Sequence, residues 1–241
     1  MSDIKHIVKS KYSSIAAAPG HTCSCSARKS VSKEIGYTDE QLQTVGVADM
    51  GLGCGNPIAF SKIKLGDTVV DLGSGGGIDC FLTAKKTGPT GKVIGIDFSE
   101  EMIAKAKANA TRGGFTVVEF RLGDIEQLPL EDNSADIIIS NCVINLAPDK
   151  QKVFHEVYRV LKPGGALYVS DIVLLENLSQ EQRSDEELIA GCVGGALLKD
   201  DYIAIAKKSG LNVRVLSENK SISKQQYQGI PLESLMLEAI K

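Results

Sequence analysis

The sequence has few histidines, no excess of positive charge and no long apolar run, and each of these absences excludes a class of function. Three histidines are too few to predict a histidine-based metal site. A formal net charge of −3 and a pI near 5.7 leave no basic stripe for a nucleic acid. No apolar run is long enough to span a bilayer. We therefore expect a small-molecule substrate, no nucleic acid and no membrane.

The first residues also lack the uninterrupted apolar segment of a secretory signal, which favours a cytoplasmic protein. In that reducing compartment cysteines stay mostly reduced and are candidates for ligands or redox chemistry. The six cysteines are Cys23, Cys25, Cys54, Cys80, Cys142 and Cys192.

The most informative stretch is 67–79, DTVVDLGSGGGID. An apolar run reaches Asp71, a glycine-dense turn follows, and a helical pattern begins at Ile78. Glycines let a backbone turn sharply and approach a ligand closely, and a helix N-terminus favours an anionic or polar group. The frame is acid-x-Gly-x-Gly-x-Gly, whereas a dinucleotide fingerprint would need its third glycine at Ile78. The stretch predicts a nucleotide-like ligand, and its alternative is a glycine turn in an unrelated α/β domain.

Apolar runs and helical patterns alternate regularly along the central part of the chain. The predicted strands are 68–72, 93–96, 117–122, 135–140 and 166–172, and the predicted helices between them are 78–86, 100–111 and 150–161. Such alternation is typical of βαβ units. We therefore predict an α/β fold with a doubly wound, mostly parallel sheet and helices on both faces. Ligands of such sheets lie beyond the C-terminal ends of the strands.

Two further strand ends carry side chains suited to a nucleoside. The second strand ends in Asp97, which is placed to accept hydrogen bonds from ribose hydroxyls. Phe98 and Met102 follow as possible apolar contacts for an adenosine. The alternatives are a surface acid that caps a helix for Asp97, and simple packing for the two apolar residues.

The segment VVDLGSGGG resembles the first motif of the class I S-adenosylmethionine (SAM) methyltransferases, whose turn carries the amino-acid end of the cofactor. The run 123–126 resembles the segment that meets the adenine. The resemblance implies a seven-stranded sheet whose antiparallel last strands are 212–216 and 235–240. The cofactor-binding residues that we predict are Asp71, Gly73, Ser74, Gly75, Gly77, Asp97, Phe98, Met102, Asp124, Ile125, Glu126 and Asn141.

Three cysteines lie in loops among small residues. Cys54 stands in GLGCGNP, a segment without helical or strand periodicity, so we expect an accessible thiol. Cys142 directly follows the fourth strand, and Cys192 lies in AGCVGG. A lone loop cysteine would ordinarily be a small residue of no consequence. Cys80, within a predicted helix, is interpreted as a buried small hydrophobe, and His155 as a surface residue.

A narrower resemblance covers nearly the whole chain. The segments GCGNP, DLGSGGGIDCF, IGIDFSEEMIAKA, SNCVINL and AGCVGGA are similar to those of the arsenite SAM methyltransferases. The resemblance implies that Cys54, Cys142 and Cys192 hold trivalent arsenic. It also implies a role for an N-terminal cysteine, either Cys23 or Cys25, and a thiol reductant, such as thioredoxin or a small thiol, that sustains turnover.

The chemistry of arsenic agrees with three thiols. Trivalent arsenic is soft and three-coordinate, so thiolates suit it and carboxylates and imidazoles are poor ligands. The lone pair left on arsenic attacks the sulfonium methyl group, so the protein mainly positions the reactants and needs no general base. Two alternatives remain: methylation of a small organic acceptor such as a quinone, and a thiol-based metalloid-binding protein without transfer activity.

The chain is expected to divide into three parts. Residues 1–62 form an N-terminal helical segment that bears cysteines. Residues 63–175 form the SAM-binding α/β core. Residues 176–241 supply helices on the substrate side and the last two strands.

Overall fold

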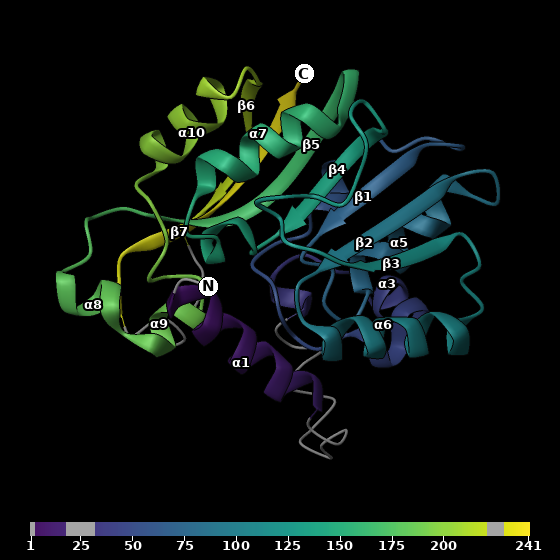
Figure 1. The fold of residues 1–241 in the computed structure, drawn as a ribbon, viewed down its shortest axis with the longest axis horizontal. Helices are drawn as coiled ribbons and strands as arrows, with labels where there is room; N and C mark the ends of the chain where they lie inside the picture. The colour runs from purple at the N-terminus through teal and green to yellow at the C-terminus, as the bar shows by residue number, and fades with distance from the viewer. Residues whose placement is uncertain (1–2, 18–31, 221–228) are drawn as a thin grey trace.

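A seven-stranded sheet forms the centre of the computed structural model, which describes residues 3–17, 32–220 and 229–241 (Figure 1). Its strands are β1 Thr68–Leu72, β2 Lys92–Asp97, β3 Val118–Leu122, β4 Ala135–Asn141, β5 Leu161–Leu174, β6 Asn212–Asn219 and β7 Leu232–Ile240. The strand order is β3-β2-β1-β4-β5-β7-β6. The first five strands pair in parallel, and β7 runs antiparallel to β5 and β6. The predicted sheet is confirmed, although β5 and β7 are longer than their sequence patterns indicated.

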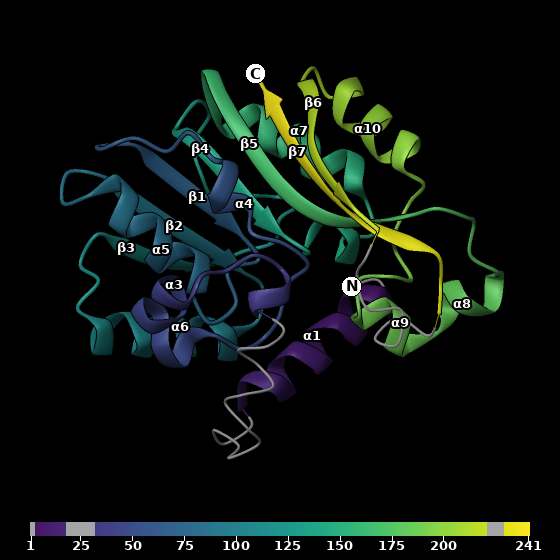
Figure 2. The ribbon, with the colours of Figure 1, turned by 180° about the vertical axis from the view of Figure 1, so that it is seen from behind.

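Helices cover both faces of the sheet, as predicted (Figures 1 and 2). Helices α3 Asp39–Val45, α5 Ile78–Thr87 and α6 Glu100–Gly113 share one core with alternate strand residues such as Val69. Helices α7 Lys150–Val160 and α10 Lys199–Lys208 share the other core with residues such as Val70. Successive side chains of a strand point to opposite faces, so a strand that is apolar throughout is buried on both.

Local sequence sets the start of α6 and thereby places the end of β2. The Ser99 hydroxyl accepts a hydrogen bond from the Met102 N–H at 3.2 Å, and Glu100 and Glu101 occupy the first turn. A capping hydroxyl and early acids both stabilise a helix N-terminus. Ser99 follows Asp97 by two residues, so the start of α6 fixes the position of Asp97 at the end of β2.

The remaining elements are α1 Asp3–Ala17, η1 Gly46–Ala48, α4 Pro57–Phe60, η2 Ile144–Leu146, α8 Gln180–Ser184 and α9 Glu186–Ala190. Helix α4 packs against β4, β5 and α5, whereas α1 and α9 lie at the C-terminal ends of the parallel strands. Figure 2 shows α1 lying beside α9 at this end of the molecule, and α1 also contacts α6. No helix in the described ranges is both long and apolar enough to cross a membrane.

Candidate active site

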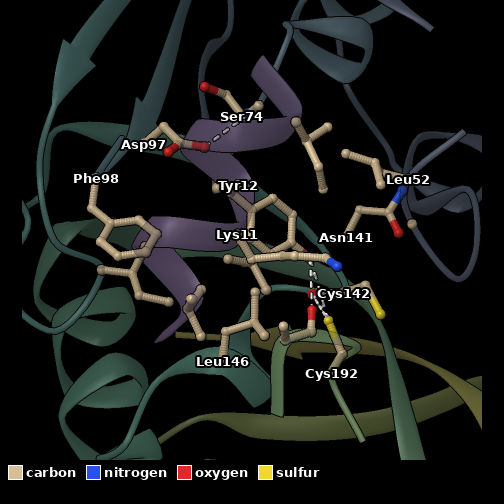
Figure 3. A pocket seen from close by; sticks show the side chains of 18 of the residues that line it. Lys11, Tyr12, Leu52, Ser74, Asp97, Phe98, Asn141, Cys142, Leu146 and Cys192 are labelled. Atoms are coloured by element: carbon tan, nitrogen blue, oxygen red, sulfur yellow. Dashed lines mark hydrogen bonds between the residues drawn. The ribbon is translucent and has the colours of Figure 1, made fainter. Parts of the chain in front are cut away.

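A cavity of about 460 Å³ opens at the C-terminal ends of β1, β2 and β4, where the predicted residues were expected to meet (Figure 3). The predicted residues that line it are Asp71, Gly73, Ser74, Gly75, Asp97, Phe98, Asp124, Ile125, Asn141, Cys142 and Cys192. Four predicted residues do not line the cavity: Cys54, Gly77, Met102 and Glu126. Residues 51–53 of the Cys54 loop also line it, so the cavity joins the ends of four strands, β1 to β4, to all three cysteine loops.

The glycine turn forms one wall of the cavity. Gly73, Gly75 and Gly77 have φ angles of 68°, 50° and 94°, in the left-handed region that side chains disfavour. A Cβ on Gly73 would lie 2.4 Å from the Val143 side chain, whereas a Cβ on Gly75 would meet nothing within 4 Å among the described residues. The buried Ser74 hydroxyl lacks a hydrogen-bond partner within the described chain. The turn is therefore open to the cavity at Gly75 and carries at Ser74 a hydroxyl that is free to bind a polar ligand.

Asp97 faces this turn from the end of β2 and is only 8% exposed. Its Oδ2 accepts a hydrogen bond from the Gly75 N–H at 3.0 Å, and its Oδ1 accepts one from the Ser99 N–H at 2.9 Å. Burial raises the pKa of Asp97, although these backbone donors lower it. The alternative of a capping surface acid is wrong, because Ser99 caps α6 and Asp97 is buried.

The remaining predicted cofactor residues divide between the cavity and its surroundings. Phe98 lines the cavity, whereas Met102 is fully buried in the interior. The carboxylates of Asp124 and Glu126 each accept a hydrogen bond from the Lys5 ammonium at 2.6 Å. Lys5 therefore fastens α1 to the segment that follows β3.

A buried acidic pair that the sequence pattern did not reveal lies behind the glycine turn. Asp79 accepts hydrogen bonds from the Tyr37 hydroxyl at 2.6 Å and from the Asn141 amide at 3.2 Å. Burial raises the pKa of Asp79 to about 6. Burial and the charge of Asp79 raise the pKa of Asp71 well above its usual value. The Asn141 amide also donates to the Gly55 carbonyl at 2.8 Å, which ties the loop of Cys54 to this pair.

The expectation that Cys54 has an accessible thiol is wrong, because the residue is only 3% exposed. Its thiol donates to the Ser170 carbonyl at 3.4 Å, and its own carbonyl accepts a hydrogen bond from the Ser234 hydroxyl at 2.7 Å. Its N–H donates to the Asn141 side chain at 3.1 Å. A loop without periodicity is thus held under the sheet by β4, β5 and β7. Burial also raises the pKa of the Cys54 thiol.

Cys142 and Cys192 have φ angles of 59° and 67°, a region that residues other than glycine occupy at a cost of about 1–3 kcal/mol. The Cys192 thiol donates to the Cys142 carbonyl at 2.8 Å, and the sulfurs of Cys54 and Cys142 lie within 4.8 Å of each other. Three loops that are far apart in the sequence therefore bring Cys54, Cys142 and Cys192 into one region, which we call the thiol cluster. Strain of this kind is often found at functional sites.

The three thiols are protonated before any ligand binds. Hydrogen bonding from Cys192 lowers the pKa of Cys142, but hydrogen bonding to Cys54 and burial raise it by more, so that it lies well above the usual value for a thiol. Hydrogen bonding to Cys142 and burial likewise raise the pKa of Cys192. A soft ligand that binds this cluster must therefore displace protons.

Comparison with known proteins identifies the family. Residues 63–210 match the family described as "Methyltransferase domain". The crystal structure of an arsenic(III) S-adenosylmethionine methyltransferase from Chlamydomonas reinhardtii has a TM-score of 0.69 and 33% identity to this chain, and the match covers 89% of this chain and 73% of that one. The chain belongs to the S-adenosylmethionine-dependent arsenite methyltransferase family.

Curated relatives agree with this assignment. An arsenite methyltransferase from Halobacterium salinarum is 47% identical over 79% of this chain and 49% of its own length. Another, from Aquipseudomonas alcaligenes, is 44% identical over 71% of this chain and 51% of its own length. The chain thus spans about half the length of the curated relatives it matches.

In this arsenite methyltransferase family member, Tyr12 of α1 reaches the thiol cluster. Its hydroxyl lies 3.3 Å from the Ala190 carbonyl oxygen, to which it donates, and 3.9 Å from the Cys192 sulfur. Figure 3 shows Tyr12 between Asp97 and Phe98 on one side and the two labelled cysteines on the other. Helix α1 therefore contacts both halves of the cavity, and a polar helix pattern alone gave no sign of this.

A buried carboxyl and a buried ammonium, also absent from the sequence prediction, lie beside the thiols of this family member. Asp171 of β5 accepts a hydrogen bond from the Tyr202 hydroxyl at 2.8 Å, and burial raises its pKa to about 7. Lys150 donates to the carbonyls of Asn145 and Ala147, and burial lowers its pKa to about 8. Their charges attract each other, and Lys150 holds the turn that follows Cys142.

Two residues that sequence reasoning left outside the site remain outside it in the structure. Cys80 is fully buried in α5, where its thiol donates to the Asp71 carboxylate at 3.2 Å, and burial raises its pKa well above the usual value. His155 lies exposed on α7. Cys23 and Cys25 fall outside the described residues.

Proposed function

We propose that this chain transfers the methyl group of SAM to trivalent arsenic, first arsenite and then methylarsenite, bound by Cys54, Cys142 and Cys192. The observation that carries this proposal is the thiol cluster at the cavity that the glycine turn lines. Thiolates are the natural ligands of a soft three-coordinate ion. A transferase for an oxygen or carbon acceptor gives no reason for three thiols from separate loops to converge there.

The wall of the cavity suits SAM in three places. The turn at 73–75 is open enough for its amino-acid end, Asp97 has oxygen lone pairs for its ribose hydroxyls, and Phe98 offers an apolar surface to its adenine. When bound, SAM would supply an electrophilic sulfonium methyl group; as the arsenic lone pair forms a bond to the methyl carbon, the sulfur–methyl bond breaks and S-adenosylhomocysteine leaves with that electron pair. The side chains of the cavity orient the two reactants, and such positioning alone accounts for large rate enhancements.

The protonated thiols of the cluster define how arsenite binds. Each thiol forms a sulfur–arsenic bond as one arsenic–oxygen bond breaks, and the thiol proton leaves with that oxygen as water. Three such exchanges leave arsenic with three sulfur ligands and one lone pair. Burial of Cys54 and Cys192 excludes solvent water from the completed site. No general base is required, because arsenic carries no proton.

One assay tests this function against its alternatives. The protein is incubated with methyl-labelled SAM, arsenite and a thiol reductant, and the label is sought on arsenic. Label that appears only on an organic acceptor such as a quinone would support a different methyltransferase. Tight arsenite binding without transfer would indicate a metalloid-binding protein.

Variants of single cysteines test the role of each thiol separately. We expect Cys142→Ser and Cys192→Ser to lose methylation of every arsenical. Cys54→Ser should reduce turnover of arsenite more than that of methylarsenite, which needs only two protein thiols. Cys80→Ser is the matched control and should retain activity, because this buried thiol belongs to α5. Equal loss on both arsenicals in Cys54→Ser would contradict the proposed division of roles.

Turnover requires a reductant, and we propose a small thiol or a thioredoxin in that role. A reducing compartment keeps the cluster in the thiol form, which is why the cytoplasm remains the expected location. An added thiol could act as a reductant or as a ligand of arsenic. Replacing it in the assay with a phosphine separates these two roles: activity that survives would show that only reduction is needed.

A further inference from the structure

A carboxyl group beside the thiol cluster, that of Asp171, is a donor which the proposed arsenic site leaves unused. Asp171 is 1% exposed, and its Oδ1 has no hydrogen-bond partner within the part of the chain that the structure describes. The ligand atoms of Cys54, Cys142 and Asp171 all lie within 4.8 Å of one another. A buried oxygen without a partner costs free energy, so its place beside two thiols requires an explanation.

Two thiolates and a carboxylate suit a different ion from arsenic. Carboxylates are poor ligands for a soft three-coordinate ion, but Zn²⁺ accepts both sulfur and carboxylate oxygen. Zinc–sulfur bonds of about 2.3 Å place the sulfurs of a tetrahedral site about 3.8 Å apart. The sulfurs of Cys54 and Cys142 would thus need to approach each other by about 1 Å at most.

Cys192 stands apart from this second set of donors, Cys54, Cys142 and Asp171. Its thiol is directed to the Cys142 carbonyl at 2.8 Å, and its sulfur is absent from the group formed by the other three donor atoms. The two sets therefore share Cys54 and Cys142 and differ in the third donor, which is the Cys192 sulfur in one and the Asp171 oxygen in the other. The third donor decides which class of ion the cluster holds.

We propose that Cys54, Cys142 and Asp171 form a binding site for a thiophilic divalent cation, such as Zn²⁺ or Cd²⁺. Each thiol releases its proton to solvent as its sulfur–metal bond forms. The three ligands then carry three negative charges, which the cation and the nearby Lys150 ammonium offset. This site goes beyond the proposed function, although it implies that the cation and an arsenical compete for two thiols.

The test is a titration of the full chain with Cd²⁺ in the absence of added thiols. Cys23→Ser and Cys25→Ser are included in every protein, so that those two residues contribute no signal. We expect one Cd²⁺ per chain and an ultraviolet charge-transfer band with the intensity of two thiolates. Cys54→Ser and Cys142→Ser should remove the band, whereas Cys192→Ser should keep it. Asp171→Asn should lower the affinity for Cd²⁺ by at least about tenfold.

Either of two results with the variants would overturn the site. One is an Asp171→Asn protein that binds Cd²⁺ as tightly as the parent, and the other is loss of the band in Cys192→Ser. Tyr202→Phe is the control for folding, because it removes the hydrogen bond to Asp171 but keeps the carboxyl group. X-ray absorption of the Zn²⁺-loaded parent protein answers the same question without a variant at Asp171. Two sulfur neighbours with oxygen are expected, and three sulfur neighbours would refute the proposal.

Failure of this inference is distinguishable from failure of the proposed function. A chain that binds Cd²⁺ through this set but transfers no methyl group to arsenic retains the cation site and loses the function. A chain that methylates arsenite but gives no cadmium–thiolate band retains the function and loses the cation site.

Discussion

The buried pair of Asp71 and Asp79 predicts a specific pH dependence of stability. Burial raises the pKa of Asp79 from 3.8 to about 6, so the folded protein favours its protonated form. A folded pKa above the unfolded one contributes stability that is fully present below pH 3.8 and is lost as the pH rises through about 6. The shift of about 2.2 pKa units, at 1.36 kcal/mol per unit, corresponds to about 3 kcal/mol.

Asp79→Asn removes this titration while leaving an amide oxygen for the Tyr37 hydroxyl. Between pH 4 and pH 7, which spans most of this titration, the free energy of unfolding should therefore shift in favour of the variant by about 2 kcal/mol relative to the parent. The charge of Asp79 also raises the pKa of Asp71. Removing that charge lowers the pKa of Asp71, which further favours the stability of the variant over that of the parent as the pH rises. Any constant cost of placing an amide near Asn141 cancels from the comparison.

The measurement is urea denaturation of both proteins at several pH values and one ionic strength, after two-state behaviour has been checked. Tyr37→Phe is the matched control. Its hydroxyl lowers the pKa of Asp79, so removing it should make stability fall more steeply and up to a higher pH. If the curves of the parent and Asp79→Asn run parallel from pH 4 to pH 7, the reasoning about this pair is refuted.

Three further substitutions test how the cavity is built. Lys5→Ala removes the two 2.6 Å ion pairs that fasten α1, so SAM binding should weaken about two- to fivefold at low salt and less at high salt, as titration at two ionic strengths would show. Tyr12→Phe loses a hydrogen bond of about 1 kcal/mol near Cys192, so the KM for arsenite should rise about fivefold with kcat little changed. Gly73→Ala combines a φ of 68° with a contact of 2.4 Å to Val143, so it should lose at least about 2 kcal/mol in chemical denaturation, and adding Val143→Ala should recover part of that loss.

Much of the cavity wall formed by the glycine turn and Asp97 could be predicted, because its residues follow one another closely after strands. Asp71 lies near the end of β1, Gly73 and Gly75 follow in the turn, and Asp97 ends the next strand. Parallel strands bring their C-terminal ends to one edge of a sheet, so the pattern of strands is enough to bring these residues together. Met102 lies one turn into α6 and faces the interior, which periodicity alone did not distinguish from a ligand contact.

The thiol cluster and its surroundings depended on contacts that no local pattern encodes. Cys54 is buried because β5 and β7 pack over its loop. Asp171 lies within the apolar strand β5, where no turn residue nearby marks it as part of a site. Tyr12 reaches Cys192 across 180 positions of sequence. Pairings of this range become visible only when the strands and loops are placed in space.

The sequence by itself determined the α/β sheet, the glycine turn and the loops in which the thiols occur, because periodicity, glycine and capping residues act over a few neighbouring positions. Tertiary structure alone decided that Cys54 is buried, that its sulfur lies within 4.8 Å of the Cys142 sulfur and that the Asp171 carboxyl group lies beside both. The physical reason is that burial and mutual distance arise from packing between distant segments, and these properties set the pKa and ligand preference of each group.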